Sequence, residues 1–143
     1  VVLDDGRPLA QSNAILLHLA EGSDLIPADA YDRARMLEWL FWEQYSHEPY
    51  IATSRFWIQH KPDSPEKVSL LASKRDGGWA ALKVMEDHLS KNDFFVGGYS
   101  IADIALFAYT HVSHEGGFPL GDFPKIRAWV ERVKAQPGFV PMA

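Results

Sequence analysis

The sequence of 143 residues contains no cysteine, and its positive charges are outnumbered. Without cysteine there can be neither a disulfide framework nor a thiolate metal site, so any thiol chemistry requires a thiol that a substrate brings. The 14 Lys and Arg against 19 Asp and Glu leave a net charge of −5, which argues against a partner bound through phosphate neutralisation. The composition therefore predicts no nucleic-acid partner.

Long hydrophobic runs are also missing. No apolar stretch approaches the roughly 18 residues of a membrane span, and the N-terminus lacks the basic flank of a signal peptide. We therefore expect no membrane partner and a cytoplasmic location. Material for a core is present, because 47% of the residues are apolar, with 8 Phe, 5 Tyr and 5 Trp. A chain of this size can bury about 68 to 70% of the surface of its unfolded form.

The clearest start signal of a helix is a capping box. Ser100 is the expected N-cap, and Asp103, three residues later, can return a hydrogen bond to the Ser100 N–H. Tyr99 and Ile104 have the placement of a hydrophobic staple. Asp103 is the only charged residue from 101 to 109, and a helix that is apolar all round belongs in the middle of a bundle. We expect the other helices to pack around this one.

The first 22 residues are expected to form strand, turn, strand and helix. Residues 1–3 are strand-forming, residues 4–7 carry a turn signal, and a second short strand follows, which predicts a β-hairpin. A hairpin is marginal alone, so we expect the sequence to begin inside a domain rather than at its start. From Ser12, apolar residues recur over two helical turns up to a stop signal at Gly22.

Residues 23–29 are a linker by composition, and we place the domain boundary there. Asp29 can cap the next helix. In residues 31–60 the apolar side chains recur with helical periodicity, which predicts a helix. Pro49 lies within this range, and a proline removes a backbone N–H and clashes with the backbone one turn earlier. A kink is therefore expected between Tyr45 and Pro49 rather than one straight rod.

A further helix is expected from Ser64 to about Asn92, and the last helix of the chain begins near Phe123. Gly77 and Gly78 weaken the middle of the helix expected at 64–92, because each glycine lowers helix stability by about 1 kcal/mol relative to alanine. The pair permits a bend, or a close approach by another part of the backbone.

Two segments of the sequence resemble the cytosolic glutathione transferases. Residues 9–16, Leu-Ala-Gln-Ser-Asn-Ala-Ile-Leu, look like the glutathione-binding segment in which Gln or Glu followed by Ser ends the fourth strand of a thioredoxin-like domain. Ser100-x-x-Asp103 is similar to the capping box of the core helix in the same family's C-terminal domain. The resemblance implies a mainly α fold: an all-α bundle at 30–143, preceded by a linker at 23–29 and by the β-hairpin and third helix of a thioredoxin-like α/β domain at 1–22.

The resemblance also implies a glutathione site at Gln11 and Ser12. A helix N-terminus presents free N–H groups and a partial positive charge to an anion, so the γ-glutamyl carboxylate of glutathione would lie beside Ser12. The side chain of Gln11 would hold the amino acid end. The alternative role of Ser12 is to cap its own helix.

The predicted pocket for the electrophilic substrate rests on Ile51 and Arg55. These residues are one turn apart and share a helix face after the expected kink. Arg55 can meet an anionic part of glutathione or of the co-substrate. The alternative role of Arg55 is an ion pair at the surface or between helices.

The activity implied by the family is transfer of the glutathione thiolate to a hydrophobic electrophile, with glutathione as co-substrate and no bound cofactor. The thiolate is the nucleophile. In the family the residue that activates it lies near the first strand, so no catalytic residue is expected in this sequence, and the chain alone should be inactive. The family also implies a homodimer through the helices that start at Ser12 and Ala30. The alternatives are a non-catalytic interaction module, and a stress or structural protein that kept the fold and lost glutathione.

Two pairs of polar residues have a spacing that could serve other chemistry. His111 and His114 could share a helix face, but a zinc site needs a third protein ligand and none is suggested, so we predict no metal site. His47 and Glu48, just before the proline, are expected to form a hydrogen-bonding pair rather than a catalytic one.

Overall fold

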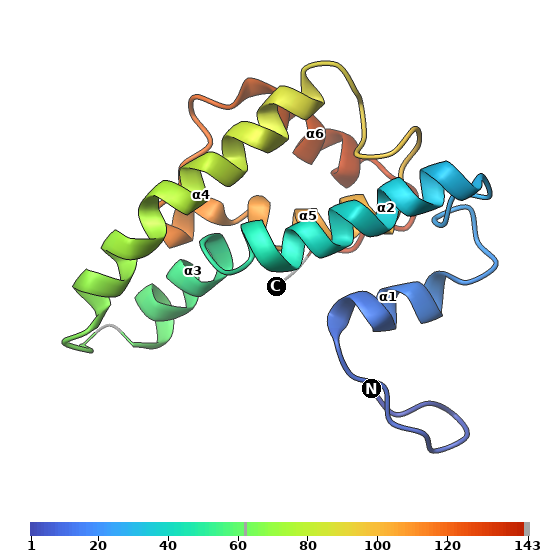
Figure 1. The fold of residues 1–143 in the computed structure, drawn as a ribbon, viewed down its shortest axis with the longest axis horizontal. Helices are drawn as coiled ribbons and strands as arrows, with labels where there is room; N and C mark the ends of the chain where they lie inside the picture. Colours follow the sequence, from blue (N-terminus) through green and yellow to red (C-terminus); the bar gives the residue numbers. More distant parts are fainter. Residues whose placement is uncertain (62, 142–143) are drawn as a thin grey trace.

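The computed structural model describes residues 1–61 and 63–141, and it is mainly helical, as expected (Figure 1). The helical elements follow in chain order: α1 (Ser12–Ala20), α2 (Ala30–Trp42), a π-helical turn η1 (Glu43–His47), α3 (Ile51–His60), α4 (Lys67–Leu89), α5 (Ile101–Thr110), a 3-10 turn η2 (Ser113–Gly116) and α6 (Pro124–Lys134). Among the described residues, no helix is both long enough and apolar enough to cross a bilayer.

The predicted β-hairpin at the N-terminus is not formed as a pair of strands. The part of the chain that the structure describes contains no strand, and residues 1–9 form an isolated antiparallel bridge between Val2 and Pro8, beside which Val1 and Leu9 exchange two backbone hydrogen bonds of 2.9 and 3.0 Å. The chain does turn there, because the N–H of Leu3 donates to the carbonyl of Arg7 at 2.9 Å. Two very short segments, one of them carrying a proline, have no third strand to pair with, and such a hairpin is marginal.

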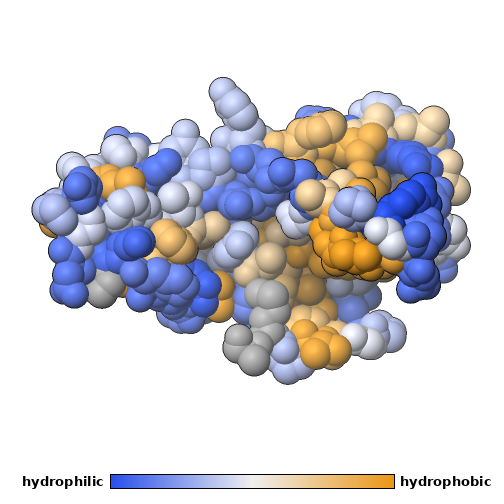
Figure 2. Space-filling view, turned by 90° about the horizontal axis from the view of Figure 1, so that it is seen from below, coloured by the Kyte–Doolittle hydropathy of each residue, from blue (hydrophilic) through white to orange (hydrophobic). Residues whose placement is uncertain are grey.

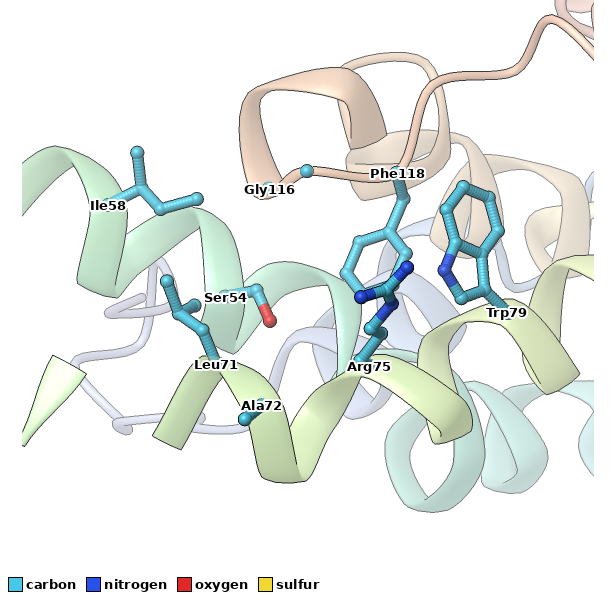
Figure 3. Close-up of a pocket in the computed structure, with 9 residues that line it drawn as sticks. Ser54, Ile58, Leu71, Ala72, Arg75, Trp79, Gly116 and Phe118 are labelled. Atoms are coloured by element: carbon cyan, nitrogen blue, oxygen red, sulfur yellow. The ribbon is translucent and has the colours of Figure 1, made fainter. Parts of the chain in front are cut away.

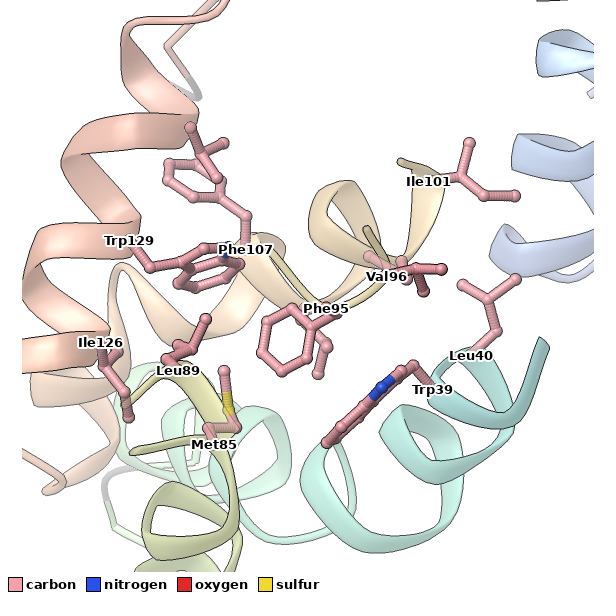
Figure 4. Packing of buried hydrophobic residues seen from close by; sticks show 14 of the residues in the cluster. Trp39, Leu40, Met85, Leu89, Phe95, Val96, Ile101, Phe107, Ile126 and Trp129 are labelled. Atoms are coloured by element: carbon pink, nitrogen blue, oxygen red, sulfur yellow. The ribbon is translucent and has the colours of Figure 1, made fainter. Parts of the chain in front are cut away.

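The helix α5 lies at the centre of the bundle, and it packs against α1, α2, α3 and α6. The predicted capping box begins it. The hydroxyl of Ser100 accepts the N–H of Ala102 at 3.3 Å, and the carboxylate of Asp103 accepts the N–H of Ser100 at 3.0 Å. Most of the side chains around α5 are apolar and fully buried (Figure 4).

Asp103 also holds together segments that are far apart in the sequence. Its Oδ1 accepts the indole N–H of Trp129 in α6 at 2.8 Å and the backbone N–H of Phe95 at 3.3 Å. Its Oδ2 accepts the hydroxyl of Ser100 at 3.2 Å as well as the backbone N–H of that residue. Burial raises the pKa of Asp103 to about 6, although these hydrogen bonds act in the opposite direction.

The expected interruption of the long second helix is present. The α-helical geometry of α2 ends at Trp42, the π-helical turn follows, and α3 starts at Ile51, just beyond Pro49. A π-helical turn is rare, and such turns often occur at functional sites.

The glycine pair does not break α4, which runs without interruption from Lys67 to Leu89. The close approach predicted there involves side chains rather than another backbone. A Cβ atom on Gly77 would lie 2.2 Å from the ring of Tyr50, and one on Gly78 would lie 2.3 Å from the ring of Phe118. The two glycines therefore let α3 and the segment after η2 pack tightly onto α4.

Candidate functional site

The start of α1 carries the two residues assigned to glutathione. Gln11 is the N-cap, and its backbone has φ 69° and ψ 119°. Among the described residues it is the only non-glycine residue with positive φ. No side chain caps the helix, so the first N–H groups of α1 have no side-chain acceptor. Sparsely populated backbone conformations cost about 1–3 kcal/mol each, and they cluster at ligand sites.

Ser12 is the first residue of α1 and not its N-cap, so the alternative role of capping its own helix is wrong. Both Gln11 and Ser12 are exposed. Ser12 lines a cavity of about 390 Å³ between α1, η1 and α5, which we call the α1–α5 cleft. Gln11 lines a second cavity of about 390 Å³ between α1 and α2. The corner that contains both residues is therefore open and faces cavities on two sides.

The α1–α5 cleft also contains polar residues that sequence reasoning missed. The side-chain amide of Asn13 donates to the carbonyl of Leu40 at 3.1 Å and lies 3.5 Å from Oε2 of Glu43. Glu43 is only 2% exposed. Burial raises the pKa of this carboxyl, and the charge of nearby Glu48 adds to the effect. The only signal in the sequence was a carboxylate that directly follows the apolar run Leu40, Phe41 and Trp42.

The comparisons with known proteins agree with this architecture. Residues 40–137 match the family model described as glutathione S-transferase, C-terminal domain. The chain belongs to the glutathione S-transferase family. The predicted family is thereby confirmed, and residues 40–137 have the all-α fold of the family's C-terminal domain. Glutathione is the co-substrate of this family, as the resemblance implied.

Three relatives illustrate the range of the family. A crystal structure of a glutathione S-transferase from Xanthobacter autotrophicus Py2 is 50% identical, with a TM-score of 0.93 over 97% of this chain and 68% of that chain. Glutathione S-transferase theta-3 of Mus musculus is 31% identical over 91% of this chain. The disulfide-bond oxidoreductase YfcG of Escherichia coli K12 is 29% identical over 94% of this chain. The chain spans 58% and 63% of the length of these last two relatives.

In this member of the family, Ile51 and Arg55 belong to α3, whereas Gln11 and Ser12 stand at the start of α1. Ile51 is fully buried in the core, and Arg55 Nε donates to Oε2 of Glu115 at 2.5 Å. The ion pair between elements, left open as the alternative role of Arg55, is therefore present. Neither Ile51 nor Arg55 lines the two cavities beside the α1 N-terminus. Their role in an electrophile pocket stays a prediction, which the burial of Ile51 does not favour.

The predicted hydrogen-bonding pair of His47 and Glu48 is wrong. Nε2 of His47 lies 2.9 Å from the hydroxyl of Thr110, and its Nδ1 is buried without a hydrogen-bond partner. Glu48 instead accepts from the amide of Gln44 at 2.5 Å. Because Thr110 donates its own proton to the carbonyl of Leu106 at 2.6 Å, His47 is the donor to Thr110. The side chain of His47 thus points into the core, where α5 packs, and not toward Glu48.

The two histidines considered for metal binding, His111 and His114, have different surroundings. Nδ1 of His111 lies 2.8 Å from the carbonyl of Phe107, and the two rings stack with centroids 4.4 Å apart. His114 is exposed. Within residues 1–61 and 63–141, no three His, Cys, Asp or Glu side chains are grouped to hold a metal ion.

Proposed function

We propose that this chain is part of a glutathione transferase, an enzyme that joins the glutathione thiolate to a hydrophobic electrophile. The observation that carries the proposal is the N-terminus of α1, which is uncapped, exposed and preceded by the strained residue Gln11. Its free N–H groups and partial positive charge suit the γ-glutamyl carboxylate, and the hydroxyl of Ser12 adds a further donor. The side chain of Gln11 would hold the amino acid end.

The proposed division of labour follows the family. Residues 1–22 would complete a thioredoxin-like domain, residues 23–29 would link the domains, and residues 30–143 would form the helical domain. One hydrogen bond supports the docking of the linker, because the N–H of Ile101 at the start of α5 donates to the carbonyl of Leu25 at 3.1 Å. The group that lowers the pKa of the glutathione thiol is assigned to no residue of this chain, so the chain alone should not catalyse the transfer.

Replacing Ser12 with alanine is expected to weaken glutathione binding by about tenfold. The change removes one charge-assisted hydrogen bond to the γ-glutamyl carboxylate, and such bonds contribute about 1.5–3 kcal/mol. The measurement is calorimetric titration of glutathione into the full-length transferase. Ser69→Ala is the matched control, because Ser69 is an exposed residue of α4 whose hydroxyl donates to the carbonyl of Glu66, the N-cap of the same helix, at 2.9 Å.

Two results would count against the proposed site and the proposed reaction separately. Equal affinity of the Ser12→Ala and parent proteins would show that the carboxylate binds elsewhere. Tight glutathione binding without transfer to any of a panel of aromatic electrophiles would favour the alternative function, a non-catalytic interaction module that keeps the glutathione site.

We further propose that the protein is a homodimer that uses the exposed side of α1 and α2. Apolar residues gather over the part of the surface that contains α1 (Figure 2). Large apolar side chains remain 71–84% exposed on these two helices and η1, although monomeric proteins rarely leave broad apolar patches uncovered. They are Leu19, Tyr31, Phe41 and Tyr45.

The proposed dimer predicts that Phe41→Glu dissociates the protein. Phe41 is 72% exposed and lines the cavity between α1 and α2, so its replacement should leave the fold intact and place a charge in the interface. Sedimentation equilibrium is expected to give a mass of two chains for the parent and one for the variant. Val68→Glu, at a 76% exposed apolar residue of α4, is the matched control and should stay dimeric. A parent mass of one chain would contradict the proposal.

A further inference from the structure

Another cavity lies between α3, α4 and the segment that follows η2, and we call it the α3–α4 pocket (Figure 3). Its volume is about 330 Å³, and none of its residues lines the two cavities beside Gln11 and Ser12. The lining residues come from three segments: Ser54 and Ile58; Leu71, Ala72, Arg75 and Trp79; and Gly116, Gly117 and Phe118.

The walls of this pocket are held by tight packing. Phe118 is only 3% exposed, and its ring meets that of Trp79 edge to face with centroids 5.3 Å apart. The absence of a side chain on Gly78 admits the Phe118 ring, and a Cβ atom on Gly116 would lie 2.9 Å from the carbonyl oxygen of Ile51. The pocket is therefore largely preformed, which lowers the cost of binding a ligand.

The interior of the α3–α4 pocket is suited to a flat apolar group. Trp79 and Phe118 form an aromatic side, and Figure 3 shows Ile58 and Leu71 at the other end. The hydroxyl of Ser54 donates to the carbonyl of Tyr50 at 2.6 Å, so its oxygen can only accept a hydrogen bond from a ligand.

Among the described residues, Arg75 is the one charged side chain that lines the pocket. In Figure 3 its side chain extends from α4 toward the segment that carries Gly116 and Phe118. Within residues 1–61 and 63–141, Arg75 takes part in none of the ion pairs. Glu115, next to the lining residue Gly116, is already bound to Arg55 and to Gln59, with oxygen–nitrogen distances of 2.5 and 2.7 Å. Five other arginines do have such partners: Arg7, Arg33, Arg35, Arg55 and Arg132.

We propose that the α3–α4 pocket binds a small aromatic carboxylate. The ring packs against Trp79 and Phe118, and the carboxylate meets the planar guanidinium of Arg75, which can donate two parallel hydrogen bonds to it. A phosphate monoester fits less well, because it would bring nearly two negative charges to a single cation. The volume is at the lower end of the range for small-molecule sites, so the ligand has one or two rings.

The test is calorimetric titration of 2-naphthoate into the full-length protein. We expect saturable binding that Arg75→Gln weakens about tenfold, because the charge-assisted hydrogen bonds are lost. The neutral amide, 2-naphthamide, is expected to bind weakly, and to the same extent in both proteins. Arg127→Gln is the matched control, since Arg127 is likewise exposed and without a carboxylate partner among the described residues, but lies on α6 away from the pocket.

Several outcomes would overturn the assignment. Absence of saturable binding would exclude the site, and equal binding by the Arg75→Gln and parent proteins would exclude the role of Arg75. Octanoate binding as tightly as 2-naphthoate would show that the pocket does not select an aromatic body. Displacement of 2-naphthoate by glutathione would place the acid in the glutathione site instead. Because Arg75 is exposed, equal melting temperatures of variant and parent are expected, and they separate lost binding from lost folding.

Discussion

Replacing Asp103 with alanine is expected to lower the free energy of unfolding by about 3–5 kcal/mol. Asp103 is fully buried, and its two carboxylate oxygens accept hydrogen bonds from Trp129, Phe95 and both donors of Ser100. Alanine would leave these donors buried without acceptors, and each unsatisfied group costs about 1–3 kcal/mol. It would also remove the connection between α5, α6 and the segment before α5.

The free energy of unfolding is measured by urea denaturation at pH 7 and compared with that of a matched variant. Asp32→Ala removes the acid at the same position in the first turn of α2, where the carboxylate has no such buried partners, and should cost less than about 1 kcal/mol. Trp129→Phe removes only the indole donor while keeping most of the ring packing, so an intermediate loss is expected. Equal losses for Asp103→Ala and Asp32→Ala would show that capping alone explains the role of Asp103.

Acidification is expected to destabilise the protein through His47, by up to about 3 kcal/mol from this one group. Burial lowers the pKa of His47 from an ordinary value of 6.5 to about 4. The imidazole is therefore neutral in the folded protein, whereas below pH 6.5 the unfolded chain takes up a proton at this residue. The stability that His47 contributes is present above pH 6.5, and it is lost as the pH falls from about 6.5 to about 4.

The measurement is the free energy of unfolding of the parent and His47→Gln proteins at several pH values between about 4.5 and 7.5. As the pH falls, the parent should lose up to about 3 kcal/mol of unfolding free energy relative to His47→Gln, because glutamine does not titrate. Asp103 acts in the opposite direction, since its raised pKa means that its contribution falls as the pH rises from about 4 to about 6. Asp103 is present in both proteins, so its effect cancels in the difference.

A histidine without burial provides the control for this experiment. His18→Gln removes an exposed imidazole of α1 and controls for the general effect of replacing a histidine with glutamine. Parallel curves for His47→Gln and the parent would contradict the prediction, because they would mean that His47 titrates alike in the folded and unfolded states.

The sequence by itself determined what depends on neighbours along the chain. The spacing of Ser100 and Asp103 encodes a capping box within one helical turn. Pro49 interrupts its helix whatever that helix packs against, because the proline acts on the backbone one turn earlier. The same local motif, together with the Gln11-Ser12 segment, was enough to indicate the family. These features need no knowledge of which surfaces meet.

The tertiary structure alone decided which partners distant residues find. Asp103 meets Trp129 26 positions later, and His47 meets Thr110 63 positions later. Glu86 of α4 accepts the first N–H groups of α6, from Lys125 at 3.0 Å and Ile126 at 2.9 Å, although no side chain within α6 caps that helix.

The prediction of two N-terminal strands was wrong for the same reason that these long-range contacts could not be predicted from local sequence. Whether residues 1–9 form strands depends on a third strand beside them, just as the acceptor of a helix N–H depends on which helix lies next to it. Propensity and spacing act through a few neighbouring residues, whereas long-range contacts depend on how whole helix faces pack, and one sequence does not specify that packing by local rules.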